Sequence, residues 1–214
     1  MATRAERAER SRTNLISAAT AALIAGNGDF ELQEIARRAR VSVGLAYHRF
    51  GSKAGLIAAV VDHFYDEIEK AMDLGDFHYK DWAVRERERL SRLIDFLYSH
   101  KLTEVIISKL ARDPEVAAVE TKRWKDLTAI SARNIIKSQE RGQVPRILNA
   151  SILSAMISGA VRHALSEALT ASPRPSKAEL SQSLWTFITR GMQLDAKSAQ
   201  IIPLKPLFLK RSRK

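Results

Sequence analysis

The sequence predicts an all-α protein, with a small N-terminal domain of short helices followed by a larger C-terminal helical bundle. Nearly every segment repeats its apolar residues at three- and four-residue spacing, the period of an amphipathic helix, whereas the alternation typical of β-strands is scarce. In the N-terminal region, glycine-rich or polar breaks follow one another at short intervals, so the helices between them are short. Beyond Trp82 the apolar stripes are longer. A chain of 214 residues with 45% hydrophobic residues can form one domain or two small ones.

Four helices are expected in the N-terminal region of the chain, one with an apolar stripe over 15–23 and three over about 32–39, 43–49 and 53 to the early seventies. The sequence Gly-Asn-Gly-Asp ends the first helix, and Gly26 or Gly28 suits a left-handed C-cap. Ser42 can cap the third helix, and Gly51 ends it. We therefore expect the first three helices to be short.

Five longer helices are expected in the C-terminal region, over about 82–99, 102–111, 114–142, 149–170 and 177–193. Asp113 followed by Pro114 is a strong helix start, because Asp caps the free backbone N–H groups and Pro suits the first turn. Ser176 and Glu179 have the spacing of a capping box. The two prolines in TASPRPS exclude a helix between the last two segments.

The net charge of +11 is concentrated at the two ends of the chain. Residues 1–55 carry +4, residues 56–204 only +2, and residues 205–214 carry +5. Basic ends indicate a polyanionic partner, either nucleic acid or an anionic surface. For the last ten residues, a solubilising tail explains the charge equally well.

Several classes of function find no support in the sequence. Cysteine is absent, which excludes disulfides and a thiol nucleophile, and neither a signal peptide nor an apolar run of about 18 residues is present. We therefore expect a cytoplasmic protein that does not span a membrane. No catalytic motif is present, and we expect no catalytic residue, no metal and no cofactor. The five histidines are scattered without metal-ligand spacing, at positions 48, 63, 78, 100 and 163.

Residues 31–53 have the dimensions of a helix-turn-helix, whose second helix enters the major groove of DNA. Gly44 has no side chain and lets the backbone approach DNA, while Val43 and Leu45 offer apolar contacts to thymine methyl groups. Side chains with donors can hold phosphates without reading sequence. The residues expected at DNA are Ser42, Val43, Gly44, Leu45, Tyr47, His48 and Lys53. Ala46 and Phe50 are expected to face the core. The alternative is a helical corner without a DNA-binding role.

The stretch LQEIARRARVSVGLAYHRFGSKAGLIAAVV resembles the DNA-binding domain of TetR-family transcriptional regulators. The matching positions are Ile35, Ala36, Ala39, Val41, Ser42, Gly44, Tyr47, His48, Phe50, Ser52 and Lys53. The segment SRTNLISAA is similar to the first helix of the family, and its Arg12 joins the expected DNA-binding residues. The resemblance covers about 10–65, and the rest of the chain matches in architecture and length alone.

Three positions depart from the family pattern. Arg40 stands where the family has glycine in the turn, and a left-handed conformation there costs about 1 kcal/mol. Leu45 replaces a Thr or Ser, which removes one polar groove contact. Glu31 replaces the usual Thr cap of the second helix. These changes bear on operator preference and affinity.

The resemblance also implies an effector pocket and a dimer interface in the C-terminal helices. Polar groups on otherwise apolar helix faces are the candidates for the pocket, namely Tyr98, Trp124, Leu127, Asn134 and His163, although each polar residue alone is more often structural. Small residues along 150–170 allow close helix packing, and the last helix is apolar over much of its circumference. The expected interface residues are Ala155, Gly159, Leu180, Leu184, Phe187 and Ile188. Burial within the chain would give the same pattern.

We therefore interpret residues 1–55 as a DNA-binding domain, 56–200 as an effector-binding and dimerisation domain, and 201–214 as a basic tail. The expected function is a homodimeric repressor that binds double-stranded DNA at a palindromic operator and is released by an unidentified small-molecule effector. Two alternatives stay open: the same fold acting as an activator or without an effector, and a helical protein that binds DNA without sequence choice. In the tail, Ile201 and its apolar neighbours are expected to pack on the body, while the last basic residues stay exposed.

Overall fold

The computed structural model describes residues 3–73 and 81–192, and within these residues it contains helices and no strand. The α-helices are α1 (Arg4–Ala25), α2 (Leu32–Arg38), α3 (Val43–Phe50), α4 (Lys53–Met72), α5 (Trp82–Ser99), α6 (Lys101–Val105), α7 (Pro114–Glu140), α8 (Ala150–Thr170) and α9 (Lys177–Gly191), and a π-helical turn, η1 (Ile106–Leu110), continues α6. The predicted all-α fold is confirmed. The expected packing of the tail lies outside the described residues.

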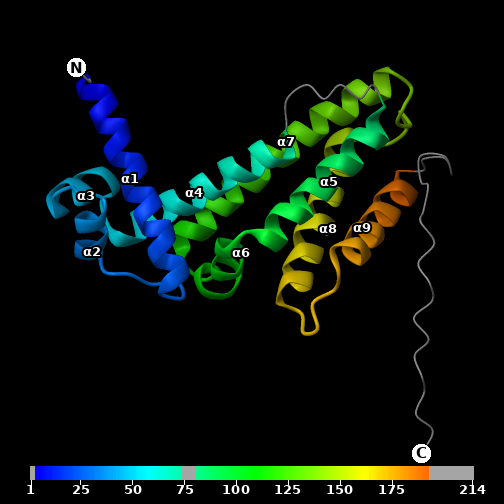
Figure 1. The fold of residues 1–214 in the computed structure, drawn as a ribbon. Coiled ribbons are helices and arrows are strands. Elements are labelled where there is room, and N and C mark those ends of the chain that lie inside the picture. The colour runs from blue at the N-terminus through cyan, green and yellow to red at the C-terminus, as the bar shows by residue number, and fades with distance from the viewer. Residues whose placement is uncertain (1–2, 74–80, 193–214) are drawn as a thin grey trace, which may run out of the picture.

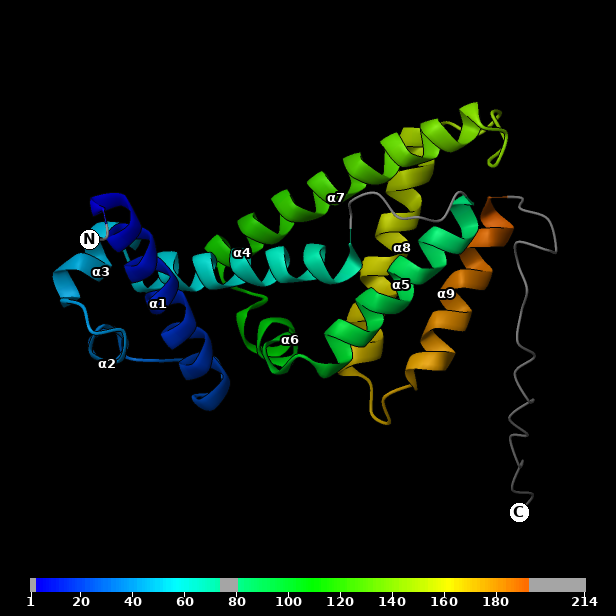
Figure 2. The same ribbon diagram turned by 45° about the horizontal axis from the view of Figure 1, so that its top comes forward.

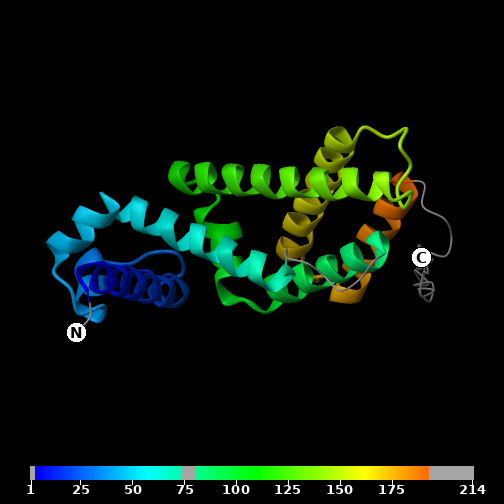
Figure 3. The ribbon, with the colours of Figure 1, turned by 90° about the horizontal axis from the view of Figure 1, so that it is seen from above.

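The molecule is elongated, with α1–α3 at one end and the bundle of α5, α8 and α9 at the other (Figure 1). Helix α4 leaves the first group and runs into the bundle, where α7 lies along it (Figures 2 and 3). The predicted boundary between residues 55 and 56 therefore falls in the first turn of a continuous helix of 20 residues. The two regions share α4 as a common structural element.

Helix α1 is longer than the sequence analysis expected, since its 22 residues begin at Arg4. Thr3 and Glu6 form a capping box: the Glu6 backbone N–H donates to the Thr3 hydroxyl at 3.1 Å, and the Thr3 N–H donates to the Glu6 carboxylate at 2.7 Å. This box starts the helix well before the apolar stripe. The expectation of a short first helix was wrong because the stripe marks only the segment that is buried.

The N-terminal three helices and the start of α4 share one apolar core. Leu15 and Leu23 of α1 are fully buried, as are Ile35 of α2 and Leu56 of α4. Fully burying a side chain of this size stabilises the fold by about 1.5–3 kcal/mol. Ala46 of α3 joins this core, which packs one face of α3 against α2 and α4 and leaves the other face exposed.

One cluster of ion pairs and one hydrogen bond join α4 to α7 within the bundle. The Arg123 guanidinium of α7 reaches three carboxylates on successive turns of α4, with Nε 2.7 Å from Asp62, Nη2 2.5 Å from Asp66 and Nη1 3.2 Å from Glu69. Burial alone would lower the pKa of Arg123, but the hydrogen bonds and charges of Asp62 and Asp66 outweigh it and raise the pKa. The Tyr65 hydroxyl of α4 donates to Glu120 of α7 at 3.1 Å.

Besides α4, a contact between the turn after α1 and the segment of α6 and η1 joins the two ends of the molecule. The turn after α1 packs against α6 and η1, and Gly28 adopts φ +98° there. A Cβ atom on Gly28 would lie 2.7 Å from the Cβ of Lys109 in η1, so only glycine fits this approach. The prediction of a left-handed C-cap is wrong for Gly26, which caps α1 with φ −94°, whereas Gly28 two residues later has the positive φ that glycine favours.

Candidate nucleic-acid interface and ligand cavity

Helix α3 is short and has one packed and one exposed face. The Leu45 backbone N–H donates to the Ser42 hydroxyl at 3.1 Å, which confirms Ser42 as its cap. Ala46 is buried and Phe50 packs against the core, as predicted. The opposite face presents Tyr47, whose exposed fraction is 51%.

The other residues expected at DNA lie on or beside this exposed face. His48 and Gly44 are exposed, whereas Val43 and Leu45 are half-buried at the edge of the helix. A Cβ atom on Gly44 would meet no protein atom within 4 Å. Packing within the chain therefore does not require glycine at position 44, and the space next to its Cα atom is open.

The turn before α3 has the left-handed conformation that the family pattern implied. Arg40 adopts φ 57°, and the Val41 N–H donates to the Ala36 carbonyl at 3.0 Å to close the end of α2. Glu31 caps α2 by backbone conformation alone, without a side-chain hydrogen bond. Both departures from the family pattern are thus accommodated within an unchanged turn.

Gly55 holds α3 against α4, and the sequence analysis missed it. A Cβ atom on Gly55 would lie 2.0 Å from the Phe50 carbonyl oxygen, which no side chain can tolerate. The Gly55 N–H also donates to the Ser52 hydroxyl that caps α4, at 2.9 Å. The available signal was a glycine in the first turn of an otherwise good helix former.

Lys53 is engaged within the protein, unlike the other predicted phosphate contacts. Its ammonium forms an ion pair with Asp29 and lies 5.5 Å from the centre of the Phe30 ring. The hydrogen bond from Lys53 lowers the pKa of Asp29 below its usual range. A phosphate would have to replace this ion pair, so Lys53 first of all anchors the turn after α1. Arg12, in contrast, is exposed on α1.

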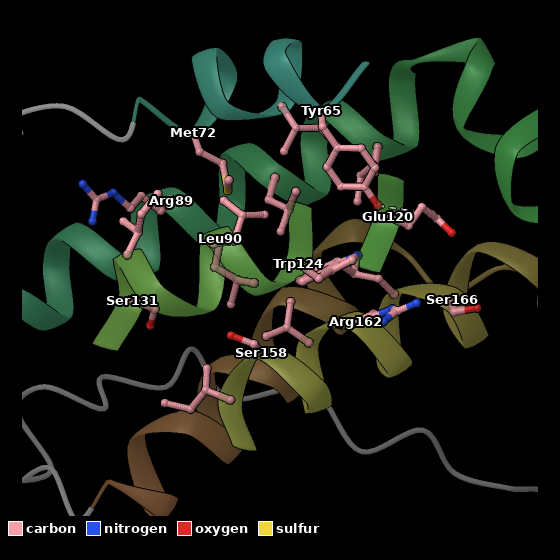
Figure 4. Close-up of a pocket in the computed structure, with 18 of the residues that line it drawn as sticks. Tyr65, Met72, Arg89, Leu90, Glu120, Trp124, Ser131, Ser158, Arg162 and Ser166 are labelled. Carbon is pink, nitrogen blue, oxygen red and sulfur yellow. Dashed lines mark hydrogen bonds between the residues drawn. The ribbon is translucent and has the colours of Figure 1, made fainter. Parts of the chain in front are cut away.

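A cavity of about 370 Å³ lies inside the bundle, walled by α4, α5, α6 with η1, α7, α8 and α9 (Figure 4). This volume falls in the lower end of the range of roughly 300–1,000 Å³ that small-molecule sites occupy. Its middle is apolar, with Leu90, Leu93, Leu127 and Val161 among the lining residues.

Three of the five predicted pocket residues line this cavity, and two do not. Trp124, Leu127 and Asn134 share one face of α7 and line it. The Tyr98 hydroxyl instead donates to the Pro175 carbonyl at 3.1 Å, outside the cavity. His163 is exposed on α8 and is absent from the lining. For these two residues the structure differs from the prediction.

Charged and polar groups gather at the two ends of the cavity, with Arg89 and Ser131 at one end and Glu120 and Arg162 at the other (Figure 4). At the first end the nearly buried Arg89 guanidinium donates to Glu86 at 2.7 Å. At the second end Tyr65 bonds to Glu120, and burial first, then the charge of Glu120, raises the pKa of Tyr65. The cavity can therefore hold an apolar body and bind polar groups at its ends.

Three buried polar atoms in the cavity wall have no hydrogen-bond partner among the described residues, namely Trp82 Nε1, Trp185 Nε1 and Thr103 Oγ1. The two indoles stack with ring centroids 6.4 Å apart. Both tryptophans are buried. The sequence analysis did not identify them as lining a cavity, because their spacing shows only helical periodicity.

The predicted dimer residues divide into an exposed and a buried group. Ala155, Gly159 and Phe187 are exposed, beside two further apolar side chains of α8, Ile152 and Met156, which are 62% and 61% exposed. The second group, consisting of Leu180, Leu184 and Ile188, is 5–7% exposed and packs inside the chain. These three are core residues, because α9 turns that side of its apolar surface toward α5 and α8.

An exposed α3 in a helix-turn-helix, joined by one helix to a helical bundle with a cavity, is the architecture of a DNA-binding transcriptional regulator. Residues 15–60 match the model of "Bacterial regulatory proteins, tetR family". The chain therefore carries the DNA-binding domain of the TetR family at residues 15–60, and it is a DNA-binding regulator and not an enzyme.

Individual relatives agree with this assignment. The HTH-type transcriptional regulator UidR of Escherichia coli K12 is 24% identical over 157 residues, which are 70% of this chain and 77% of UidR. A crystal structure described as a TetR-family regulator from Mesorhizobium loti is 25% identical with a TM-score of 0.67, covering 89% of this chain and 98% of the other. The regulator FadR from Bacillus subtilis, solved with stearoyl-CoA, shares the fold, with 18% identity, a TM-score of 0.65, and coverage of 84% and 98%.

None of the helices within residues 3–73 and 81–192 is both long and apolar enough to cross a membrane.

Proposed function

We propose that this TetR-family regulator is a cytoplasmic homodimeric repressor, which binds a palindromic operator and leaves it when a small molecule occupies the cavity. Residues 1–55 would bind DNA, and residues 56–200 would bind the effector and the second protomer. The observation that carries the proposal is the Tyr65–Glu120 hydrogen bond in the cavity wall. It joins the helix that leads to α3 with a helix that lines the cavity, so a ligand that disturbs this bond acts on the DNA-binding region.

The exposed face of α3 supports the assignment of DNA contacts. Val43 and Leu45 would meet base edges, and the open space at Gly44 would let the backbone approach. Tyr47 and His48, with Ser42 and Arg12 beside them, would donate to phosphates. Two copies of α3 in a symmetric dimer would then meet half-sites separated by about one turn of DNA or a multiple of it.

The exposed apolar side chains of α8 and α9 support a dimer through these helices. Met156→Lys places a charge in the middle of this surface, and we expect monomers by sedimentation and loss of operator binding. Ile136→Lys, at an exposed apolar position on α7, is the matched control and should remain dimeric. A Met156→Lys dimer as tight as the wild type would contradict the interface.

The experiment that tests the function is selection of bound duplexes from a random pool, followed by a screen for small molecules that release them. A repressor of this kind yields a palindromic site and at least one releasing compound. Equal, strongly salt-dependent binding to every duplex would favour a DNA-architectural protein instead. Selection of a palindrome with reporter activation, or without any releasing ligand, would favour an activator or an effector-independent regulator.

A further inference from the structure

Arg162 differs from the other arginine that lines the cavity. Arg89 is held by the carboxylate of Glu86 at 2.7 Å. Arg162 has neither a hydrogen bond nor an ion pair with any residue in 3–73 or 81–192, and its guanidinium lies 5.9 Å from the centre of the Trp124 ring. A guanidinium presents five donors in a planar fork that fits a carboxylate or a phosphate.

The surroundings of Arg162 form one polar end of the cavity. Ser158 and Ser166 stand four residues before and after it on α8, and all three line the cavity. Arg162 and Ser166 lie at the same end as Tyr65 and Glu120 (Figure 4). The positive charge of Arg162 also acts on the Tyr65 phenol and opposes the rise of its pKa.

Resting on the proposed function, we propose that the effector is an amphipathic anion, with an apolar body in the cavity and a carboxylate, phosphate or sulfate group bound by Arg162. The apolar lining between the two ends accommodates the body. The serine hydroxyls add neutral donors beside the guanidinium. Because Arg162 is exposed at the cavity end, the anionic group stays in contact with solvent and is not fully desolvated.

This placement also links the ligand to α4. An anion at Arg162 lies at the same end as the Glu120 carboxylate, and like charges repel more strongly in a partly buried site than in water. This repulsion disfavours the position of the Glu120 carboxylate in which it accepts the hydrogen bond from the Tyr65 hydroxyl. Binding of the anion therefore weakens the contact between α4 and α7.

The test uses the full-length protein and two matched probe sets, decanoate with decanol and decylamine, and naphthoate with naphthol and naphthylmethylamine. Affinity is measured by calorimetry, and release of the selected duplex by fluorescence anisotropy. Decyl phosphate and decyl sulfate, below micelle-forming concentrations, distinguish the three anionic groups. We expect at least one acid to bind roughly tenfold more tightly than its alcohol and amine, a difference that Arg162→Leu abolishes and Arg162→Lys partly keeps.

Arg133→Leu is the control, since Arg133 is exposed on α7 and lies outside the cavity lining, and it should bind acids like the wild type. The inference is overturned, and the proposed function kept, if an alcohol or amine binds and releases DNA at least as well as its acid, or if Arg162→Leu binds acids unchanged. Binding by no member of any set overturns the inference together with the effector role of the cavity.

Discussion

The Tyr65 hydroxyl and the Glu120 carboxylate lie 3.1 Å apart in the wall of a cavity, where their hydrogen bond joins α4 to α7. Tyr65 stands in the middle of α4, whose first residue, Lys53, follows α3 after only two residues. A single neutral-to-charged hydrogen bond thus joins the cavity wall on α7 to the helix that follows α3.

Removing this bond should change regulation more than stability. We expect Tyr65→Phe to cost about 0.5–1.5 kcal/mol of unfolding free energy and to lower operator affinity without ligand by roughly two- to tenfold, because α4 loses a tie to α7. The control is Tyr98→Phe, which removes a bond of equal length to Pro175 outside the cavity. Denaturant unfolding and DNA titration should show a similar stability loss in both variants but weaker DNA binding in Tyr65→Phe alone.

Alkaline titration should identify Tyr65 as a late-ionising phenol. Burial and Glu120 raise the pKa of Tyr65, so the folded state holds its proton more tightly than the unfolded state does. The stability that results is complete below the unfolded value of about 10 and is lost as the pH rises through the folded value. When the phenolate absorbance is followed against pH, the ionisation step of Tyr65 should come after those of the other tyrosines. This step should be missing in Tyr65→Phe and should move to lower pH in Glu120→Gln. A titration of Glu120→Gln that coincides with the wild type would contradict the role of Glu120.

The Arg123 cluster should hold α4 in place through charge. Arg123→Gln leaves Asp62, Asp66 and Glu69 as neighbouring like charges on α4. We expect a loss of about 1–2 kcal/mol of unfolding free energy, smaller at high salt because these carboxylates are partly exposed. Arg133→Gln makes the same change at an exposed position of the same helix and should be nearly neutral. Equal losses in the two variants, or a loss that salt leaves unchanged, would speak against the cluster.

Two glycines beside the recognition helix should respond oppositely to the same substitution. Gly44→Ala meets no protein atom and adds a helix-favouring residue, so stability should stay the same or rise by up to about 1 kcal/mol while DNA binding weakens. Gly55→Ala forces a Cβ against the Phe50 carbonyl and should lower the unfolding free energy by about 1–3 kcal/mol. Thermal unfolding and anisotropy with the selected duplex separate the two effects. Unchanged DNA binding in Gly44→Ala would show that no close approach occurs there.

Features encoded by neighbouring residues could be predicted from the sequence. The caps at Ser42 and Ser176 and the helix start at Pro114 depend on contacts within four residues, and all three are present, whereas the left-handed Arg40 followed from the family resemblance. The start of α1 at Arg4 is equally local. The first turns of this helix carry no apolar stripe, so a prediction based on the stripe places the start of the helix too late.

Features that depend on which face of a helix turns inward were harder to predict. Trp124 and Asn134 share a face and line the cavity together, whereas the spacing of His163 could not show that it lies on the outer side of α8. Leu184 looked like an interface residue for the same reason. The ion pair of Lys53 joins it to Asp29, which is 24 positions away, and only the folded chain brings the two together.

Because Gly28 approaches Lys109 so closely, the DNA-binding helices are attached to the bundle at two points, one through α4 and one through η1. Two fixed points define an axis, so the easiest rigid-body motion of these helices is rotation about the line that joins them. Both attachments carry cavity-lining residues, Tyr65 on α4 and Ile106 on η1. On the proposed function, a ligand that moved the two attachments by different amounts would tilt this axis and with it the direction in which α3 points.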